Sequence, residues 1–202
     1  SFVEKKMNKS MQVIIKKCDI VIIPENGPDE ENIKRVGPIV RQTSFSREDL
    51  RKKFTFDKKT LVVSIGGTDA GLFLIEKMLK LKPKIDLDLV IVSGPALSKK
   101  FDESVRNLGF VDNLHEIIYA ADVLVSLAGK STIDEAKAYG TPAIFIPIKG
   151  HFEQEDNARG EGFVFDDINR LEKLILEKLD QRRTPVETKG AIKASEIIKK
   201  LI

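Results

Sequence analysis

Three segments of the chain place glycine together with hydroxyl, basic or acidic side chains directly after short apolar runs, a pattern that suits binding of a phosphorylated ligand. The first, SIGGTDAG, spans residues 64–71. Glycines allow the backbone to approach a ligand closely, and a helix that starts after them attracts an anion. The segment lacks the Gly-Lys-Ser/Thr ending of a P-loop and the GxGxxG spacing of a dinucleotide site. Taken alone, it fits a tight strand-to-helix turn as well as a binding loop.

The second segment, SLAGKST, spans residues 126–132. It precedes a helical pattern, so its backbone N–H groups would be exposed at the start of a helix. Thr132 and Glu135 also have the spacing of a capping box, in which the acid would serve only its own helix. Glu135 therefore has two interpretations, a helix cap or a ligand-binding acid.

The third segment, PIKGHFEQEDNA, spans residues 147–158. Its His, Glu, Gln and Asn side chains offer donors and acceptors suited to sugar hydroxyls, and the alternative is a solvated loop with capping residues. We expect no metal site, because His151 has no second His four residues later. His115 is expected on a helix surface, without a role. The single Cys18 excludes a disulfide framework and a cysteine metal cluster.

Short β-branched runs alternate with amphipathic stretches, the pattern of a parallel sheet covered by helices. We therefore predict an α/β fold, a Rossmann-like open parallel sheet with helices on both faces. Strands are expected at Ile20–Ile23, Leu61–Ile65, Leu89–Val92, Val123–Ser126 and Ala143–Ile146. Helices are expected at Gly71–Leu81, Ala96–Val105, Leu114–Ala120, Thr132–Tyr139, Gln154–Arg159 and Ile168–Leu179. Ligands of such sheets bind at the carboxyl ends of the strands, which the glycine-rich segments follow.

The first part of the chain does not fit this alternation. Residues 1–23 predict a helix followed by a strand, and the acidic, Pro- and Gly-containing residues 24–31 have the composition of a linker. The regular pattern begins only at Thr60, after a short helix signal at residues 46–50. We therefore expect residues 1–35 to be the remnant of an N-terminal domain with its linker, and residues 36–202 to form one complete domain.

Composition excludes several classes of protein. Hydrophobic residues make up 42% of the chain, and 34 Lys or Arg against 31 Asp or Glu give a net charge of +3, so disorder is not expected. No apolar run reaches the roughly 18–20 residues of a membrane-spanning helix, and no signal-peptide pattern precedes the domain. We expect a cytoplasmic protein, with a peripheral position at the inner face of the membrane left open.

The positive charge is concentrated at residues 182–202, where six basic residues stand against two acids, a local +4. The remainder of the chain is then about −1. A nucleic-acid partner is not expected, because such a binder carries a wider basic face with aromatic side chains between the charges. A solvated basic helix is the simpler interpretation of this segment.

Taken in order, the three segments resemble the C-terminal, donor-binding half of the GT-B glycosyltransferases of family 28. The resemblance covers roughly residues 35–202. It rests on SIGGTDAG at 64–71, GFVDNLHEIIYAADVLVSLAGKSTIDEAKAYGTPAIFIP at 109–147 and GHFEQEDNA at 150–158. It implies transfer of a sugar from a nucleoside diphosphate donor, with uridine expected as the nucleoside, to an acceptor held by an N-terminal domain, without a cofactor.

The resemblance also implies roles for individual residues on the nucleoside side of the donor. Gly66, Gly67 and Thr68 correspond to the glycine loop that faces the nucleotide sugar. Phe110 and Val111 correspond to the segment that holds the base through a ring contact and main-chain hydrogen bonds. The catalytic base of the family lies in the N-terminal domain, so no catalytic residue is expected in this chain.

For the diphosphate, the resemblance implies a site at the second segment, formed by Gly129, Lys130, Ser131 and Thr132. Glu135 then gains the role of holding the ribose hydroxyls. The chain departs from the lipid II-forming enzymes of the family at residues 127–128, where Leu-Ala replaces Arg-Ser, which weakens the expectation of uridine specificity. Lys130 is expected to supply the missing positive charge near the phosphates.

For the donor sugar, the resemblance implies contacts from Glu153 and Gln154, supported by His151 and Asn157. Two rival functions use the same scaffold: a nucleotide-sugar hydrolase, in which water replaces the acceptor, and a non-catalytic donor-binding subunit of a split glycosyltransferase.

Residues 191–202 place Ala194, Ile197, Ile198 and Leu201 on one helical face. That face would cover the N-terminal domain, lie on a membrane surface or, left exposed, drive dimerisation.

Overall fold

The computed structural model describes residues 2–95, 97, 101 and 105–201, with side chains from residue 9 onward. The chain divides into two compact units. The larger unit comprises Arg41–Val186, and the smaller unit combines Ser1–Val40 with Glu187–Ile202. The two units are described separately below.

The larger unit contains a five-stranded parallel sheet in the order β5-β4-β3-β6-β7. Its strands are β3 (Thr60–Ser64), β4 (Asp88–Val92), β5 (Arg106–Asn107), β6 (Val123–Leu127) and β7 (Ala143–Ile146). The predicted α/β fold is confirmed, and the four strands predicted for this region agree with the structure to within one residue at each end. The two-residue edge strand β5 was not predicted, because an exposed Arg-Asn pair carries no apolar pattern.

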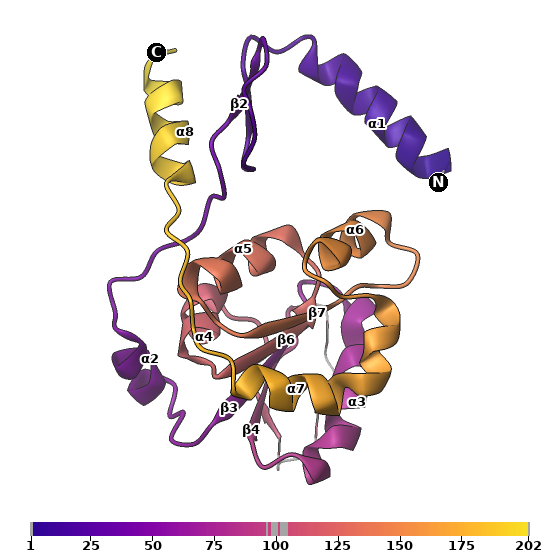
Figure 1. Cartoon of the computed structure of the whole chain (residues 1–202), viewed down its shortest axis with the longest axis vertical. Helices are drawn as coiled ribbons and strands as arrows, with labels where there is room; N and C mark the ends of the chain where they lie inside the picture. The colour runs from indigo at the N-terminus through magenta and orange to yellow at the C-terminus, as the bar shows by residue number, and fades with distance from the viewer. Residues whose placement is uncertain (1, 96, 98–100, 102–104, 202) are drawn as a thin grey trace. The chain divides into compact units, whose positions relative to one another are not determined.

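Helices lie around this sheet, as drawn in Figure 1. They are α2 (Arg47–Lys53), α3 (Leu72–Leu81), α4 (Leu114–Ala120), α5 (Lys130–Tyr139), α6 (Phe152–Gly160) and α7 (Leu171–Leu179), with 3-10 turns at Asp69–Gly71, Lys82–Lys84 and Phe165–Arg170. The chain moves along the sheet in opposite directions before and after β5. Right-handed crossovers therefore place α3 on one face and α4 and α5 on the other. The helix predicted at residues 96–105 lies mostly outside the described residues.

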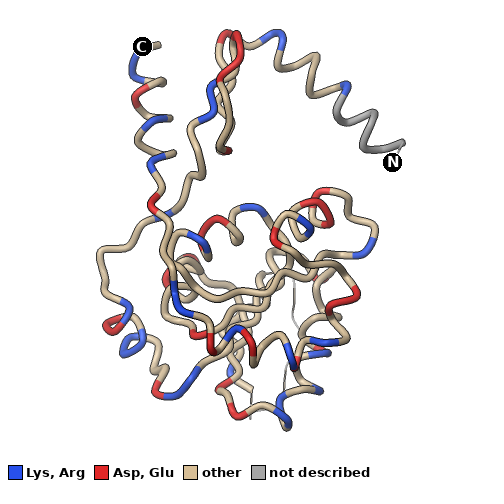
Figure 2. Tube along the Cα trace, viewed as in Figure 1, with Lys and Arg blue, Asp and Glu red and all other residues tan. Residues whose placement is uncertain are grey.

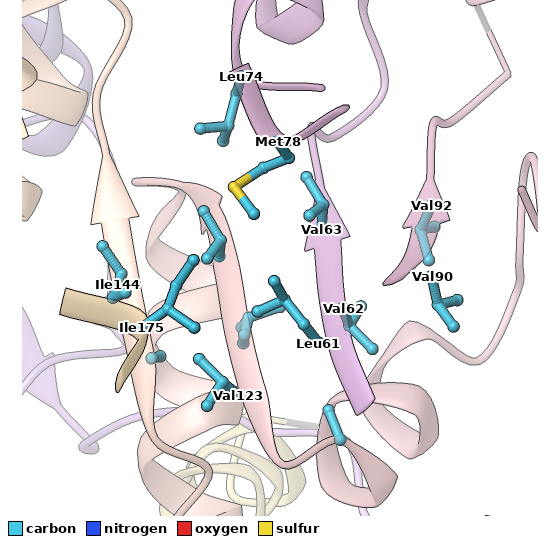
Figure 3. Packing of buried hydrophobic residues seen from close by; sticks show 14 of the residues in the cluster. Leu61, Val62, Val63, Leu74, Met78, Val90, Val92, Val123, Ile144 and Ile175 are labelled. Atoms are coloured by element: carbon cyan, nitrogen blue, oxygen red, sulfur yellow. The ribbon is translucent and has the colours of Figure 1, made fainter. Parts of the chain in front are cut away.

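The core of the larger unit lies where the central strands meet these helices. All residues of β3 and β6 are buried, as expected of parallel strands covered on both faces. Leu74 and Met78 of α3 and Ile175 of α7 pack over the strands (Figure 3) and have no exposed surface. Each such side chain contributes about 1.5–3 kcal/mol through burial.

An aspartate at the start of β6 fastens α2 to the sheet. Asp122 accepts hydrogen bonds from Arg47 at 2.7 Å, from Arg51 at 2.8 Å and from the backbone N–H of Thr60 at 2.8 Å. Burial alone would raise the pKa of Asp122, but the Thr60 N–H and the two guanidinium groups lower it below its ordinary value. This cluster lies at the amino ends of β3 and β6, opposite the edge that the glycine-rich segments follow.

Arg183 corrects the interpretation of the basic C-terminal segment as a solvated helix. Its half-buried guanidinium stacks on Tyr119 and donates to four oxygens, the backbone carbonyls of Ala121, Tyr119 and Tyr139 and the hydroxyl of Thr141. Burial lowers its pKa to about 10. Helix α8 (Gly190–Lys199) begins only seven residues later, so the local +4 is divided between a structural clamp and a helix.

The smaller unit contains α1 (Phe2–Ile15), β1 (Val21–Ile23), β2 (Ile33–Arg35) and α8. Strands β1 and β2 pair in parallel, with Val21 opposite Ile33. The acidic residues 24–31, expected as a linker, lie inside this unit and form the connection between its two strands. Strand β2 was not predicted, because three residues with a single apolar side chain give no periodicity.

Helix α8 packs closely within the smaller unit. A Cβ atom on Gly190 would lie 2.3 Å from the carbonyl oxygen of Pro38, so only glycine fits there. Ala194 is buried, whereas Ile198 and Leu201 are exposed. The predicted apolar face is therefore divided between an inner and an outer part, and Figure 2 shows basic residues along the same helix. Among the described residues, no helix is long and apolar enough to cross a membrane.

Candidate functional site

The carboxyl ends of β3, β6 and β7 lie at one edge of the sheet, because the strands are parallel and in register. The three glycine-rich or polar segments leave the sheet at this edge, after Ser64, Leu127 and Ile146. Sites in open α/β sheets occur at such edges. We therefore take this edge as the candidate functional site.

The first loop is held by close backbone packing. Gly66 has φ +73°, and a Cβ atom on the facing Gly94 would lie 2.1 Å from the Gly66 carbonyl oxygen. A Cβ atom on Gly71 would meet the side chains of Ile65 and Leu127 at 2.6 and 2.9 Å. Only glycine therefore fits at positions 71 and 94, which pack next to the exposed residues 66–68. The structure leaves the predicted ligand-facing part of this loop open.

Leu127 is part of this packing and not of the exposed surface. It is 6% exposed, and Ala128 has no exposed surface. These are the two residues at which the family resemblance led us to expect a missing positive charge. The two residues here support the first and second loops from below, so any charge near a bound phosphate must come from other residues.

The second loop leads directly into α5, which begins at Lys130. This start is two residues earlier than predicted, and Gly129 is the N-cap. Within the described part of the chain no side chain caps this helix start, and Ser131 is exposed in its first turn. Unpaired N–H groups and the helix dipole at such an end attract an anion. The capping box predicted for Thr132 and Glu135 is wrong, because both residues already lie inside the helix.

Lys130 shares its charge with an acid on its own helix. Its ammonium group contacts both carboxylate oxygens of Asp134, one helical turn later. Asp134 is buried, and both residues of this pair lie near the start of α5. The lysine predicted to face the phosphates is therefore ion-paired with its neighbour in this structure.

Glu135 makes a long-range ion pair. Its side chain is 6% exposed, and Oε1 accepts a hydrogen bond at 2.9 Å from Nε of Arg41, whose side chain is 51% exposed. The guanidinium of Arg41 also donates to the backbone carbonyl of Asp112 at 2.8 Å, and the hydroxyl of Tyr139 donates to the Arg41 carbonyl at 2.7 Å. Arg41 thus joins Glu135 to the segment predicted to hold the base. Sequence reasoning missed Arg41, because it belongs to no motif and lies outside the predicted elements.

The segment predicted to hold the base has one exposed and one half-buried side chain. Phe110 is 61% exposed, which is unusual for a phenylalanine, whereas Val111 is half-buried and packs against the core. An exposed aromatic ring is suited to stacking on a planar base. The expected division between a ring contact and a main-chain contact is compatible with this arrangement.

His115, expected on a helix surface, lies on α4 and is half-buried. Its Nδ1 atom is buried and, among the described residues, has no hydrogen-bond partner. Burial, and next the positive charge of Arg41, hold the pKa of His115 below its ordinary value, while the nearby carboxylates of Glu135 and Glu116 oppose this. The imidazole is therefore neutral at neutral pH.

Glu116, the next residue on α4, is fixed from three sides. It accepts hydrogen bonds from Lys53 at 2.8 Å, from Thr43 at 3.0 Å and from Asn113. The hydrogen bond from Lys53 is the largest cause of its pKa lying below the ordinary value. These bonds hold the segment that follows Arg41 against α4.

The third loop is shaped by its own polar residues. Nδ1 of His151 accepts a hydrogen bond from the Gln154 N–H at the start of α6, and Oε1 of Gln154 accepts one from the Ile148 N–H at 3.1 Å. Nδ2 of Asn157 donates to the Ala128 carbonyl at 3.0 Å, which ties this loop to the second. Glu153 is exposed. Of the four predicted sugar contacts, His151 and Glu153 are exposed, and His151, Gln154 and Asn157 make the hydrogen bonds that shape the loop.

Comparison with protein families gives one match over most of the chain. Residues 60–200 match the model of the glycosyltransferase family 28 C-terminal domain. An uncharacterized glycosyltransferase from Methanopyrus kandleri is 26% identical over 220 residues, which cover 95% of this chain and 63% of the relative.

A second relative is a UDP-N-acetylglucosamine–N-acetylmuramyl-(pentapeptide) pyrophosphoryl-undecaprenol N-acetylglucosamine transferase from Thermosipho melanesiensis. It is 29% identical over 166 residues, which cover 75% of this chain and 49% of the relative. Among solved structures, the glycotransferase of kitacinnamycin superposes with a TM-score of 0.58 at 18% identity, covering 76% of this chain and 42% of that one. The chain spans between about half and two thirds of the length of these curated relatives.

Proposed function

The chain belongs to the family of glycosyltransferase family 28 C-terminal domains, and on that basis we propose that its larger unit binds the nucleoside diphosphate sugar from which the complete enzyme transfers a hexose-type sugar. The single observation that carries this proposal is the buried carboxylate of Glu135 beside an uncapped helix start. The carboxylate can accept hydrogen bonds from hydroxyl groups, and the N-terminal end of α5, about one helical turn away, attracts phosphate. Together they match the two polar parts of a nucleotide.

In this proposal the diphosphate lies at the start of α5. The backbone N–H groups of residues 129–132 would donate to its oxygens, and they would stabilise the charge that develops on the leaving diphosphate during transfer. The positive charge would come from Arg41, because Lys130 is paired with Asp134. The guanidinium of Arg41 is half exposed, and in this proposal it turns from Glu135 toward the diphosphate when the nucleotide binds.

The base would lie against Phe110, with main-chain contacts at Val111, and the ribose hydroxyls would bind Glu135. The donor sugar would lie between the first and third loops, near the exposed Gly66, Gly67, Thr68 and Glu153. His151, Gln154 and Asn157 would act by holding the third loop in place. Uridine is the nucleoside we propose, and the name of the Thermosipho melanesiensis relative includes a UDP-sugar donor.

We also propose that an N-terminal domain holds the acceptor and the catalytic base, and that residues 1–35 belong to that domain. The chain spans about half of the length of the second relative, so a large part of such an enzyme has no counterpart in it. A parallel sheet of two three-residue strands is small for an independent domain, and β1 and β2 form such a pair. The proposed enzyme acts in the cytoplasm, with α8, its exposed Ile198 and the exposed Leu201 that follows it near the membrane surface.

Isothermal titration calorimetry with uridine diphosphate, and with the other nucleoside diphosphates as competitors, tests the donor site directly. We expect one binding site per chain. The absence of binding by any nucleoside diphosphate at millimolar concentration would contradict the proposal. A longer form that includes the N-terminal domain would then separate transfer from hydrolysis, because a hydrolase releases free sugar from the donor in the absence of an acceptor.

A further inference from the structure

We propose that Tyr139 is a positioning residue of the donor site, whose hydroxyl group holds the backbone of Arg41 so that the guanidinium can pass from Glu135 to the diphosphate. This inference rests on the proposed function, because the contact between Arg41 and the diphosphate is part of it. Tyr139 would not touch the nucleotide and would act through Arg41. It lies outside the three segments that form the candidate site, and the family resemblance gave it no role.

The first argument is that two successive turns of α5 hold Arg41. Glu135 and Tyr139 are four residues apart in this helix and therefore project from the same face. Glu135 accepts a hydrogen bond from Nε of Arg41 at 2.9 Å, and the hydroxyl of Tyr139 donates one to the Arg41 carbonyl oxygen at 2.7 Å. One bond holds the side chain of Arg41 and the other holds its main chain. A ribose at Glu135 would replace the first bond and leave the second in place.

The second argument is that contacts within the larger unit fix the ring of Tyr139. The residue is 9% exposed, and its ring stacks on Tyr119 of α4 with 4.6 Å between the centroids and 24° between the planes. The guanidinium of Arg183 lies over the Tyr119 ring and donates to the backbone carbonyl of Tyr139 at 3.2 Å. Because close packing leaves such a ring little freedom, the hydroxyl at its end is a rigid anchor for a neighbouring segment.

The third argument is that regular structure does not fix the main chain at Arg41. Residues 36–46 belong to no helix or strand, so the Arg41 carbonyl takes no part in the hydrogen bonds of such an element. The side chain of Arg41 is 51% exposed, and an arginine has many rotamers. A main chain that also moved would spread the guanidinium over more positions. The bond from Tyr139 keeps Arg41 beside α5, the helix whose start is proposed to hold the diphosphate.

The experiment is a calorimetric titration of uridine diphosphate and of uridine into the unaltered chain and four variants. Tyr139→Phe removes the hydroxyl and keeps the ring. Tyr119→Phe removes a hydroxyl from the ring that stacks on Tyr139 and keeps the bond to Arg41, so it is the matched control. Arg41→Met removes the guanidinium, and its combination with Tyr139→Phe completes a double-mutant cycle. Thermal melting reports whether each variant retains the fold.

We expect Tyr139→Phe to lower the affinity for uridine diphosphate by about 3- to 10-fold, the effect of losing one hydrogen bond. Its affinity for uridine should be nearly unchanged, because uridine has no phosphate for the guanidinium to bind. In a chain that already carries Arg41→Met, Tyr139→Phe should have no further effect, since the hydroxyl acts only through that guanidinium. Tyr119→Phe should bind both ligands like the unaltered chain.

Four results would overturn the assignment of Tyr139 alone: unchanged affinity of Tyr139→Phe, an equal loss for both ligands, a loss that persists beside Arg41→Met, or a Tyr139→Phe chain that does not fold. The last three would show that the hydroxyl serves only the fold. If Arg41→Met itself leaves binding of uridine diphosphate unchanged, the role of Tyr139 falls with that of Arg41. Failure of the unaltered chain to bind either ligand would instead overturn the proposed donor site.

Discussion

Nε of Arg41 donates a hydrogen bond to Oε1 of Glu135 across 2.9 Å, although the two residues are 94 positions apart in the chain. The carboxylate is nearly buried and the guanidinium is half exposed. This pair closes the position where the ribose of a donor nucleotide is proposed to lie. The hydroxyl groups of a ligand that binds there must replace the guanidinium of Arg41 as hydrogen-bond donors to Glu135. Substitution of either Arg41 or Glu135 should therefore change the affinity for the ligand.

Replacing Glu135 with Gln should weaken binding of uridine diphosphate by about 10- to 100-fold, because hydrogen bonds to a charged group are stronger than those to a neutral amide. Titration calorimetry measures the change. Glu161→Gln is the matched control, since Glu161 pairs with Lys137 away from the loops of the site. Equal affinities of the Glu135 and Glu161 variants would show that Glu135 has only a structural role.

Replacing Arg41 with Met should reduce affinity for uridine diphosphate by about 10-fold and affinity for uridine much less, because the guanidinium is proposed to move to the diphosphate. The variant should also show a weaker dependence of affinity on salt concentration. Arg106→Met, which removes a cation at the edge strand β5, is the control. A similar loss for nucleoside and nucleotide would argue that Arg41 acts only by positioning Glu135.

Replacing Phe110 with Ala should leave the free energy of unfolding within about 0.5 kcal/mol of the unaltered value, because the ring is 61% exposed. Affinity for uridine diphosphate should fall by about 5-fold or more if the ring stacks on the base. Val164→Ala, another exposed apolar side chain, should change neither quantity. Unchanged affinity of the Phe110 variant would remove the ring contact from the proposed site.

Replacing Asp122 with Asn should lower the free energy of unfolding by about 3 kcal/mol, because Arg47 and Arg51 lose a common, partly buried partner. The pKa of Asp122 is lower in the folded chain than in the unfolded chain. Its stabilisation is therefore complete above the unfolded value of about 3.9 and is lost as the pH falls toward the folded value.

Denaturant unfolding at a series of pH values tests both statements. The unaltered chain should lose stability below about pH 4 more steeply than the variant. The same acid sensitivity in both chains would mean that other carboxylates, such as Glu116 with its similarly lowered pKa, dominate.

The sequence allowed prediction of the elements whose apolar pattern is continuous. Ala143–Ile146 was predicted to the residue, because four successive apolar residues between prolines have few alternatives. Strands β2 and β5 are short and polar, so their pairing depends on neighbours that a local pattern does not show. The start of α5 was placed too late, because a glycine N-cap without a side-chain hydrogen bond gives a weaker signal than the Thr-Glu spacing.

In the candidate site, too, the features set by local sequence could be predicted and those set by contacts between distant segments could not. Its loops could be located from their glycines and hydroxyl residues, because the conformation of each loop is set by local sequence. The contacts of Arg41 and the burial of His115 could not, because each depends on the packing of segments far apart in the chain. Long-range packing also determined that Leu127 is buried and that Arg183 is a clamp, whereas the pairing of Lys130 with Asp134 is a local contact one helical turn apart.

A structure of the chain with bound uridine diphosphate sugar tests the central claim most directly. We predict that the diphosphate lies at the backbone N–H groups of residues 129–132, with the ribose on Glu135 and the guanidinium of Arg41 moved away from that carboxylate. A nucleotide bound elsewhere on the chain, with the 2.9 Å contact between Arg41 and Glu135 intact, would contradict the donor site proposed here.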